Sequence, residues 1–140
     1  MTWKQINCEI NDRPVLVLVD RRFKEQAPLK ELQCISWFCV YCNQKPGSAF
    51  WSPDETESVD EIEDDLLRLC ESFGHGWLVY VLRLATPGVR EYYFYHSDTA
   101  EIKKVIAALK VAHPSYRIEA ETKNDPEWNE YQKYIPLEGG

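Results

Sequence analysis

Apolar and polar positions recur along this chain with two different periods, which predict strands and helices. Alternation with a period of two, or a short apolar run, predicts strands over residues 3–10, 14–20, 32–43, 77–85, 91–96 and 116–121. A period near 3.6 predicts helices over 58–73 and 98–112, and a short helix over 125–135. The chain therefore mixes strands and helices within 140 residues, a length that suits one domain.

The helix that ends near Phe73 has two chemically different sides. Its apolar positions fall on one side of a helical projection, and they are Val59, Ile62, Leu66, Leu69, Cys70 and Phe73. Ser58 and Glu61 have the spacing of a capping box, and Asp98 and Glu101 have a similar spacing before the second helix. We expect the apolar side to pack on a sheet and the other side to face water or a partner.

The order of elements from residue 32 onward is strand, helix, strand, strand, helix, strand. That order is typical of an α+β fold in which a ferredoxin-like split β-α-β core forms an antiparallel sheet with two helices on one face. We predict one domain over residues 1–140, with this core over 32–122. An N-terminal β-hairpin over 3–20 would extend one edge of the sheet, and the C-terminal helix over 125–135 would pack at its rim.

Acidic residues are concentrated in one stretch. Eight lie between Asp54 and Asp65 without a Lys or Arg among them, which exceeds the chain's net charge of −7. One interpretation is a solvated helix face, in which the helix dipole stabilises the carboxylates near the start of the helix. The other is a docking surface for a basic protein, in which aromatic residues would anchor the contact. The residues predicted to bind such a partner are Trp51, Asp54, Glu55, Glu57, Asp60, Glu61, Asp64 and Trp128.

The five cysteines offer little support for catalysis or metal binding. Cys39 and Cys42 have C-x-x-C spacing, but inside a strand residues three apart point to opposite faces. The histidines form no paired metal motif, so we predict no metal and no cofactor. The alternative that stays open is a thiol-dependent enzyme, for example one that pairs Cys42 with His75 or His96.

Composition limits the setting and the partners. No apolar run reaches the ~20 residues that a membrane span needs, and the first residues lack the apolar core of a signal peptide. We therefore expect a cytoplasmic protein with reduced cysteines that does not bind membranes. Its acidic charge argues against nucleic-acid binding, and the sequence leaves the oligomeric state open.

Three motifs together resemble a known family. They are the acidic Ile62–Leu66 helix, the strand Gly88–Tyr95, and the ending Asp125-Pro126-Glu127-Trp128 with Tyr131. The chain resembles the bacterial family of unknown function DUF695, whose members have no assigned activity. It is also distantly similar to the ribonuclease E inhibitor family of regulators, which shares a D-x-x-W-x-x-Y ending. That similarity implies a ferredoxin-like fold, an acidic surface and inhibition of a ribonuclease by direct binding. Small acidic proteins of this kind also recur as immunity proteins beside secreted toxins.

The sequence thus favours a non-catalytic protein-binding module. We expect it to inhibit a basic partner, such as a toxin or a nuclease, by presenting carboxylates where a phosphate backbone would bind. A structural or scaffolding domain without inhibitory activity is the remaining alternative.

Overall fold

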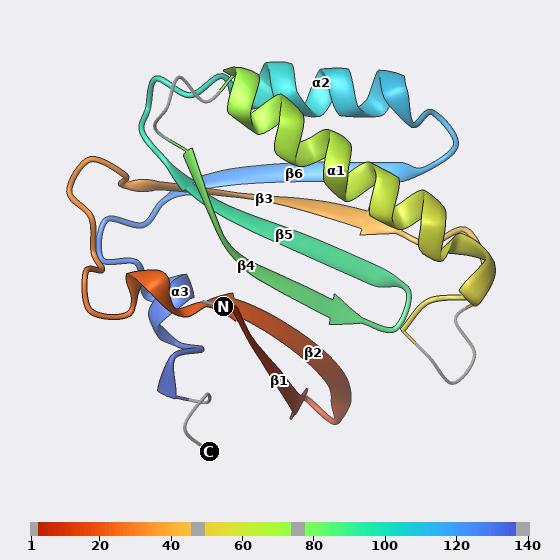
Figure 1. Cartoon of the computed structure of the whole chain (residues 1–140), viewed down its shortest axis with the longest axis horizontal. Helices are drawn as coiled ribbons and strands as arrows, with labels where there is room; N and C mark the ends of the chain where they lie inside the picture. Colours follow the sequence, from red (N-terminus) through yellow and green to blue (C-terminus); the bar gives the residue numbers. More distant parts are fainter. Residues whose placement is uncertain (1–2, 46–49, 74–77, 137–140) are drawn as a thin grey trace.

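One six-stranded antiparallel sheet organises the molecule (Figure 1). The structure, a computed structural model, describes residues 3–45, 50–73 and 78–136. The strands lie in the order β1-β2-β4-β5-β3-β6 and are β1 (Trp3–Ile10), β2 (Arg13–Asp20), β3 (Cys34–Tyr41), β4 (Leu78–Thr86), β5 (Val89–His96) and β6 (Arg117–Asn124). The helices of the described residues are α1 (Thr56–Phe73), α2 (Ile102–Ala112) and α3 (Asn129–Gln132), with 3-10 helices η1 (Arg21–Phe23) and η2 (Pro53–Glu55). The predicted α+β class is confirmed.

The N-terminal hairpin forms as predicted and extends the sheet. β1 and β2 pair along their whole length, from Trp3 opposite Asp20 to Ile10 opposite Arg13. Asn11 and Asp12 make the turn with φ of 54° and 65°, the left-handed conformation that two-residue hairpin turns require. Because β2 also pairs with β4, the hairpin carries the sheet two strands beyond β4.

Helices α1 and α2 lie on the same face of the sheet (Figure 1). As the periodicity predicts, Val59, Ile62 and Leu66 of α1 are fully buried, and Ile62 and Leu66 pack with α2 and with the aromatic strand β5. The predicted capping residues are wrong. Ser58 lies inside α1, and the chain enters through η2, whose N-cap is Ser52. Glu101 stands at the N-cap of α2, but its side chain makes no capping hydrogen bond.

The C-terminal segment builds a second core on the opposite face of the sheet. Trp128 and Tyr131 are fully buried there against the side chains of β2, β4 and β5. The predicted helix over 125–135 is shorter than expected, because Trp128 adopts a left-handed φ of 56° and α3 covers only Asn129–Gln132. The segment therefore covers a face of the sheet, where packing at the rim was expected.

Candidate functional site

Exposed carboxylates follow the outer side of η2 and α1. We define the acidic ridge as the five exposed acidic residues of this stretch, namely Asp54, Glu57, Asp60, Glu61 and Asp64. Helical spacing places them away from the buried apolar side, as the sequence predicts. Asp60 keeps 62% of its side chain exposed and lies 3.5 Å from Arg90. No ion pair or hydrogen bond joins the other four side chains to another described residue.

Two carboxylates of the same stretch are neutralised within the molecule. Glu63 lies 2.8 Å from Arg83 and 3.7 Å from Arg90, two cations that interrupt the apolar strands β4 and β5. Asp65 binds Arg68 and accepts a hydrogen bond from His113 at 2.7 Å. Burial opposes ionisation of Asp65, but these hydrogen bonds outweigh it and lower its pKa. The strand arginines were not among the residues predicted from the sequence, although a positive charge inside an apolar run is a signal that marks them.

Glu55 is a structural residue rather than part of the ridge. Its side chain is only 3% exposed, and it accepts hydrogen bonds from the backbone N–H of Asn43 and Gln44, both at 2.8 Å, and from the Tyr116 hydroxyl at 2.9 Å. Burial alone would raise the pKa of Glu55, but the hydrogen bonds from the three donors outweigh burial and lower this pKa. The carboxylate fastens η2 to the end of β3, and no oxygen is left facing outward for a partner.

The two predicted aromatic anchors also lie in the interior. Trp51 is 7% exposed and packs under Arg90, with the guanidinium carbon 4.9 Å from its ring centroid. Trp128 is fully buried on the far side of the sheet. Direct contact with a partner is thus left to the exposed members of the predicted set, which are the five residues of the acidic ridge.

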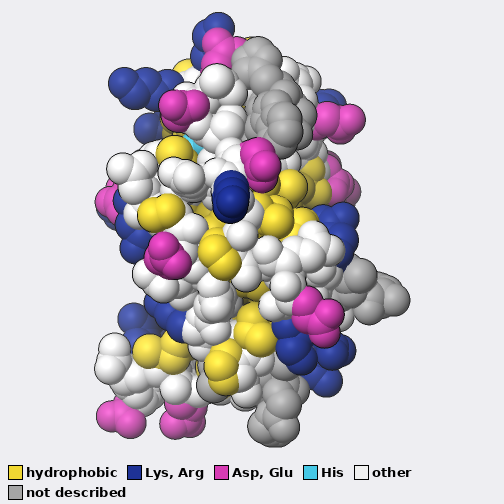
Figure 2. Space-filling model, turned by 90° about the vertical axis from the view of Figure 1, so that its left-hand side faces the viewer, with side chains coloured by type: hydrophobic (Ala, Val, Ile, Leu, Met, Phe, Trp, Pro, Cys, Tyr) yellow, Lys and Arg dark blue, Asp and Glu magenta, His cyan; other side chains and the backbone are white. Residues whose placement is uncertain are grey.

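Charges are distributed differently on another face of the molecule. On the face drawn in Figure 2, Asp and Glu side chains are separated from one another and interspersed with Lys and Arg. A mixed surface of this kind attracts neither sign strongly. The ridge, with five exposed carboxylates and no Lys or Arg between Asp54 and Asp65, differs from this mixed face.

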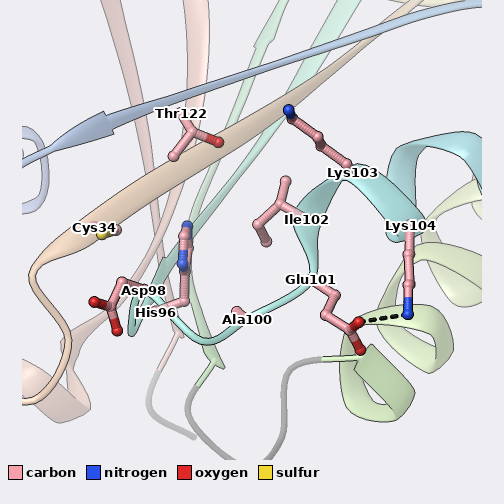
Figure 3. A pocket seen from close by; sticks show the side chains of 9 residues that line it. All are labelled: Cys34, His96, Asp98, Ala100, Glu101, Ile102, Lys103, Lys104 and Thr122. Atoms are coloured by element: carbon pink, nitrogen blue, oxygen red, sulfur yellow. Dashed lines mark ion pairs between the residues drawn. The ribbon is translucent and has the colours of Figure 1, made fainter.

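A pocket of about 530 Å³ opens where β3 begins, β5 ends and α2 starts (Figure 3). Cys34 and His96 face it, and they are direct partners in the β3–β5 pairing. Both ring nitrogens of His96 are engaged, because Nδ1–H donates to the Ser97 carbonyl at 2.7 Å and Nε2 accepts from Ser36 Oγ at 2.7 Å. Burial lowers the pKa of His96, which keeps the ring neutral. This histidine therefore has no nitrogen left to activate Cys34 as a nucleophile.

The predicted pair of Cys42 with His96 is not assembled. Cys42 follows the end of β3 that pairs with Val89, whereas His96 pairs with the opposite end, so Cys42 and His96 lie far apart. His75 lies outside the described residues. Burial raises the pKa of Cys42, and it raises that of Cys39 and Cys70 to about 12. All five cysteines are free thiols, and no cluster of described residues could hold a metal ion.

These thiols are expected to react slowly. Iodoacetamide at about pH 8 should modify Cys39 and Cys70 at least about tenfold more slowly in the folded chain than in urea, because alkylation requires the thiolate. Mass spectrometry of peptides from a time course measures both rates, and the urea sample is the control. Rapid labelling of either thiol in the folded chain would contradict the raised pKa and reopen thiol catalysis.

Comparisons with known proteins give one match. A family model described as "Family of unknown function (DUF695)" matches residues 1–135. None of the curated proteins and none of the solved structures matches the chain. The similarity to ribonuclease E inhibitors accordingly stays a prediction. None of the described helices is long and apolar enough to cross a membrane.

Proposed function

Because the chain belongs to the DUF695 family, which has no known function, we propose a function from its geometry: it binds a basic protein through the acidic ridge. Binding, not catalysis, is the proposed activity. The observation that carries the proposal is the set of carboxylates along one helix whose opposite side is fully buried. A helix fixed in this way holds its charges in a constant arrangement.

Electrostatics give this surface two consequences. Complementary charge steers a basic partner and raises its association rate, while phosphate backbones and anionic lipids are repelled. Like charges one helical turn apart cost the isolated helix a few tenths of a kcal/mol per pair, and Glu57–Glu61 and Asp60–Asp64 are two such pairs. A positively charged partner would relieve that repulsion, which favours binding over a merely solvated face.

The finer part of the proposal is inhibition. We propose that the ridge occupies the basic surface of a toxin or nuclease where a phosphate backbone would otherwise bind.

A ferredoxin-like core over β3–β6 belongs to the same proposal; the order β4-β5-β3-β6 with both long helices on one face supports it. A cytoplasmic location also belongs here, and the five free thiols support it. A scaffolding role would instead be favoured by a dimer that leaves the ridge exposed.

The test measures binding to the partner recovered from the native host, as a function of salt. Replacing Glu57, Glu61 and Asp64 by Ser should lower the association rate at low salt about tenfold and flatten its salt dependence. These three side chains are exposed and make no ion pair or hydrogen bond with another described residue, so folding should be preserved.

A matched control removes the same charge elsewhere. Glu9, Glu121 and Glu127 are exposed and lie outside the ridge, and their triple Ser variant should bind as the native chain does. An equal loss in both triple variants would mean that only net charge matters. An affinity that does not change with salt would contradict binding through the acidic ridge.

A further inference from the structure

The two helices do not cover the whole upper face of the sheet. Among the described residues, no helix lies over the hairpin strands β1 and β2 on the face that carries α1 and α2 (Figure 1). Val15, Val17 and Val19 of β2 are buried on the opposite face, whereas Leu16 and Leu18, which point to the helix side, are only half-buried. The strand β2 is thus apolar on both sides but fully covered on only one.

A groove runs between α1 and this uncovered strip. One cavity of about 340 Å³ is lined by Trp3, Leu18, Glu63, Leu67, Tyr80 and Arg83. A second of about 200 Å³ continues it, because Leu67 and Tyr80 line both. The Trp3 ring packs on Tyr80 with 4.9 Å between centroids, which forms an aromatic floor. Apart from the Glu63–Arg83 ion pair at 2.8 Å and the Glu71 side chain, the residues that line the groove are apolar or aromatic.

Leu67 is the exception to the amphipathic pattern of α1. It is an apolar residue outside the buried stripe and keeps 36% of its surface exposed. Asp60, Asp64, Leu67 and Glu71 are spaced i, i+4, i+7 and i+11, so they follow one side of the helix. Since Leu67 lines the groove, the three carboxylates stand along the same rim. An apolar groove with an acidic rim is therefore built into the molecule.

We propose that this groove binds an amphipathic basic helix of a partner protein, lying beside α1 over β2 and β4. The inference rests on the proposed function, since Asp60 and Asp64 of the ridge supply part of the charge of the rim. The partner helix would insert large apolar side chains spaced i, i+4 and i+7 next to Leu67, Leu18 and Tyr80. Its Lys and Arg residues would meet the acidic rim. It would complete the helical layer by covering the strip that α1 leaves open.

Charge selects this occupant over the others. A second copy of the chain would place one acidic rim against another, and the copies would each carry −7. An anionic membrane surface or a nucleic acid would be repelled in the same way. A neutral apolar helix would fill the groove but leave the rim without counter-charges. A helix that is basic on one side and apolar on the other satisfies both parts of the surface.

The probe is a synthetic peptide of Leu and Lys with Leu at helical spacing, roughly four turns long. A companion peptide keeps every Lys and replaces every Leu by Ser. Calorimetry should detect binding of the Leu peptide only, and NMR of the full chain should show the largest shifts at Leu18, Leu67 and Tyr80. Leu67→Ser should weaken binding about fivefold or more, because a buried leucine contact is lost.

Matched variants separate the groove from the ridge. Val111→Ser removes another exposed apolar residue, 80% exposed on α2, and should leave binding unchanged. Equal binding of the Leu and Ser peptides, or NMR shifts located away from the groove, would overturn the groove as the binding site. Either result would leave the proposed function of the ridge intact. Loss of binding in Leu67→Ser, with no effect of the Glu57, Glu61 and Asp64 triple variant, would leave the groove and overturn the proposed function. Self-association through Leu67 would assign the groove to a second copy and overturn the proposal.

Discussion

Replacing Trp128 by Ala is expected to lower the free energy of unfolding by about 4 kcal/mol, the largest effect of any single substitution considered. The indole is fully buried, stacks on Tyr95 with 3.9 Å between ring centroids, and donates a hydrogen bond from Nε1 to the Leu32 carbonyl at 2.8 Å. Truncation would open a cavity and leave that carbonyl unpaired. Urea denaturation followed by circular dichroism measures the change.

Two further variants separate the contributions of Trp128. Trp128→Phe keeps an aromatic ring against Tyr95 but loses the hydrogen bond to Leu32, so its cost should be about 2 kcal/mol. Val111→Ala, at an exposed site, should change stability by about 0.5 kcal/mol or less. A small loss in Trp128→Ala, comparable to that of Val111→Ala, would mean that the second core does not depend on the C-terminal segment.

Replacing Glu55 by Gln is expected to cost about 3 kcal/mol at neutral pH, because three donors lose a charged acceptor. The expected cost depends on pH. The pKa of Glu55 is lower in the folded chain than its ordinary value of 4.5, so the ionised form stabilises the fold above that pH. This contribution is lost as the pH falls through the folded pKa. The stability difference between the native chain and the variant should therefore shrink below about pH 4.5.

A neighbouring acidic residue provides the control for Glu55. Glu57 stands on the exposed side of the same helix entry, and Glu57→Gln should change stability by about 0.5 kcal/mol or less. Urea titrations of all three proteins at several pH values give the comparison. A constant difference between the native chain and Glu55→Gln across the acid range would contradict ionisation as the source of its effect.

Local pattern predicted the elements of this fold well. Alternation located every strand to within a few residues, and helical periodicity identified Val59, Ile62 and Leu66 as the buried side of α1. These features depend on neighbours in the chain, which a period of two or 3.6 expresses directly. The exposed ridge followed from the same projection, because residues opposite a buried stripe must face outward.

What the sequence could not predict depends on residues distant in the chain. Glu55 has the same acidic character as Glu57, and only the approach of Asn43 and Gln44 makes it a buried acceptor. Trp128 likewise has an αL conformation that helical periodicity does not indicate, and its ring stacks on Tyr95 of a distant strand. The groove could not be predicted either, because it depends on how far the hairpin extends past α1. The odd position of Leu67 was its one local signal.

The second core has a consequence for how the protein is made. The Tyr131 hydroxyl donates to the Asp20 carbonyl at 2.6 Å, across 111 positions of the chain. During synthesis the buried valines of β2 leave the ribosome long before Trp128 and Tyr131, which cover them in the folded chain. Until those residues are synthesised, the nascent hairpin exposes an apolar face. A chaperone could bind that face during this period.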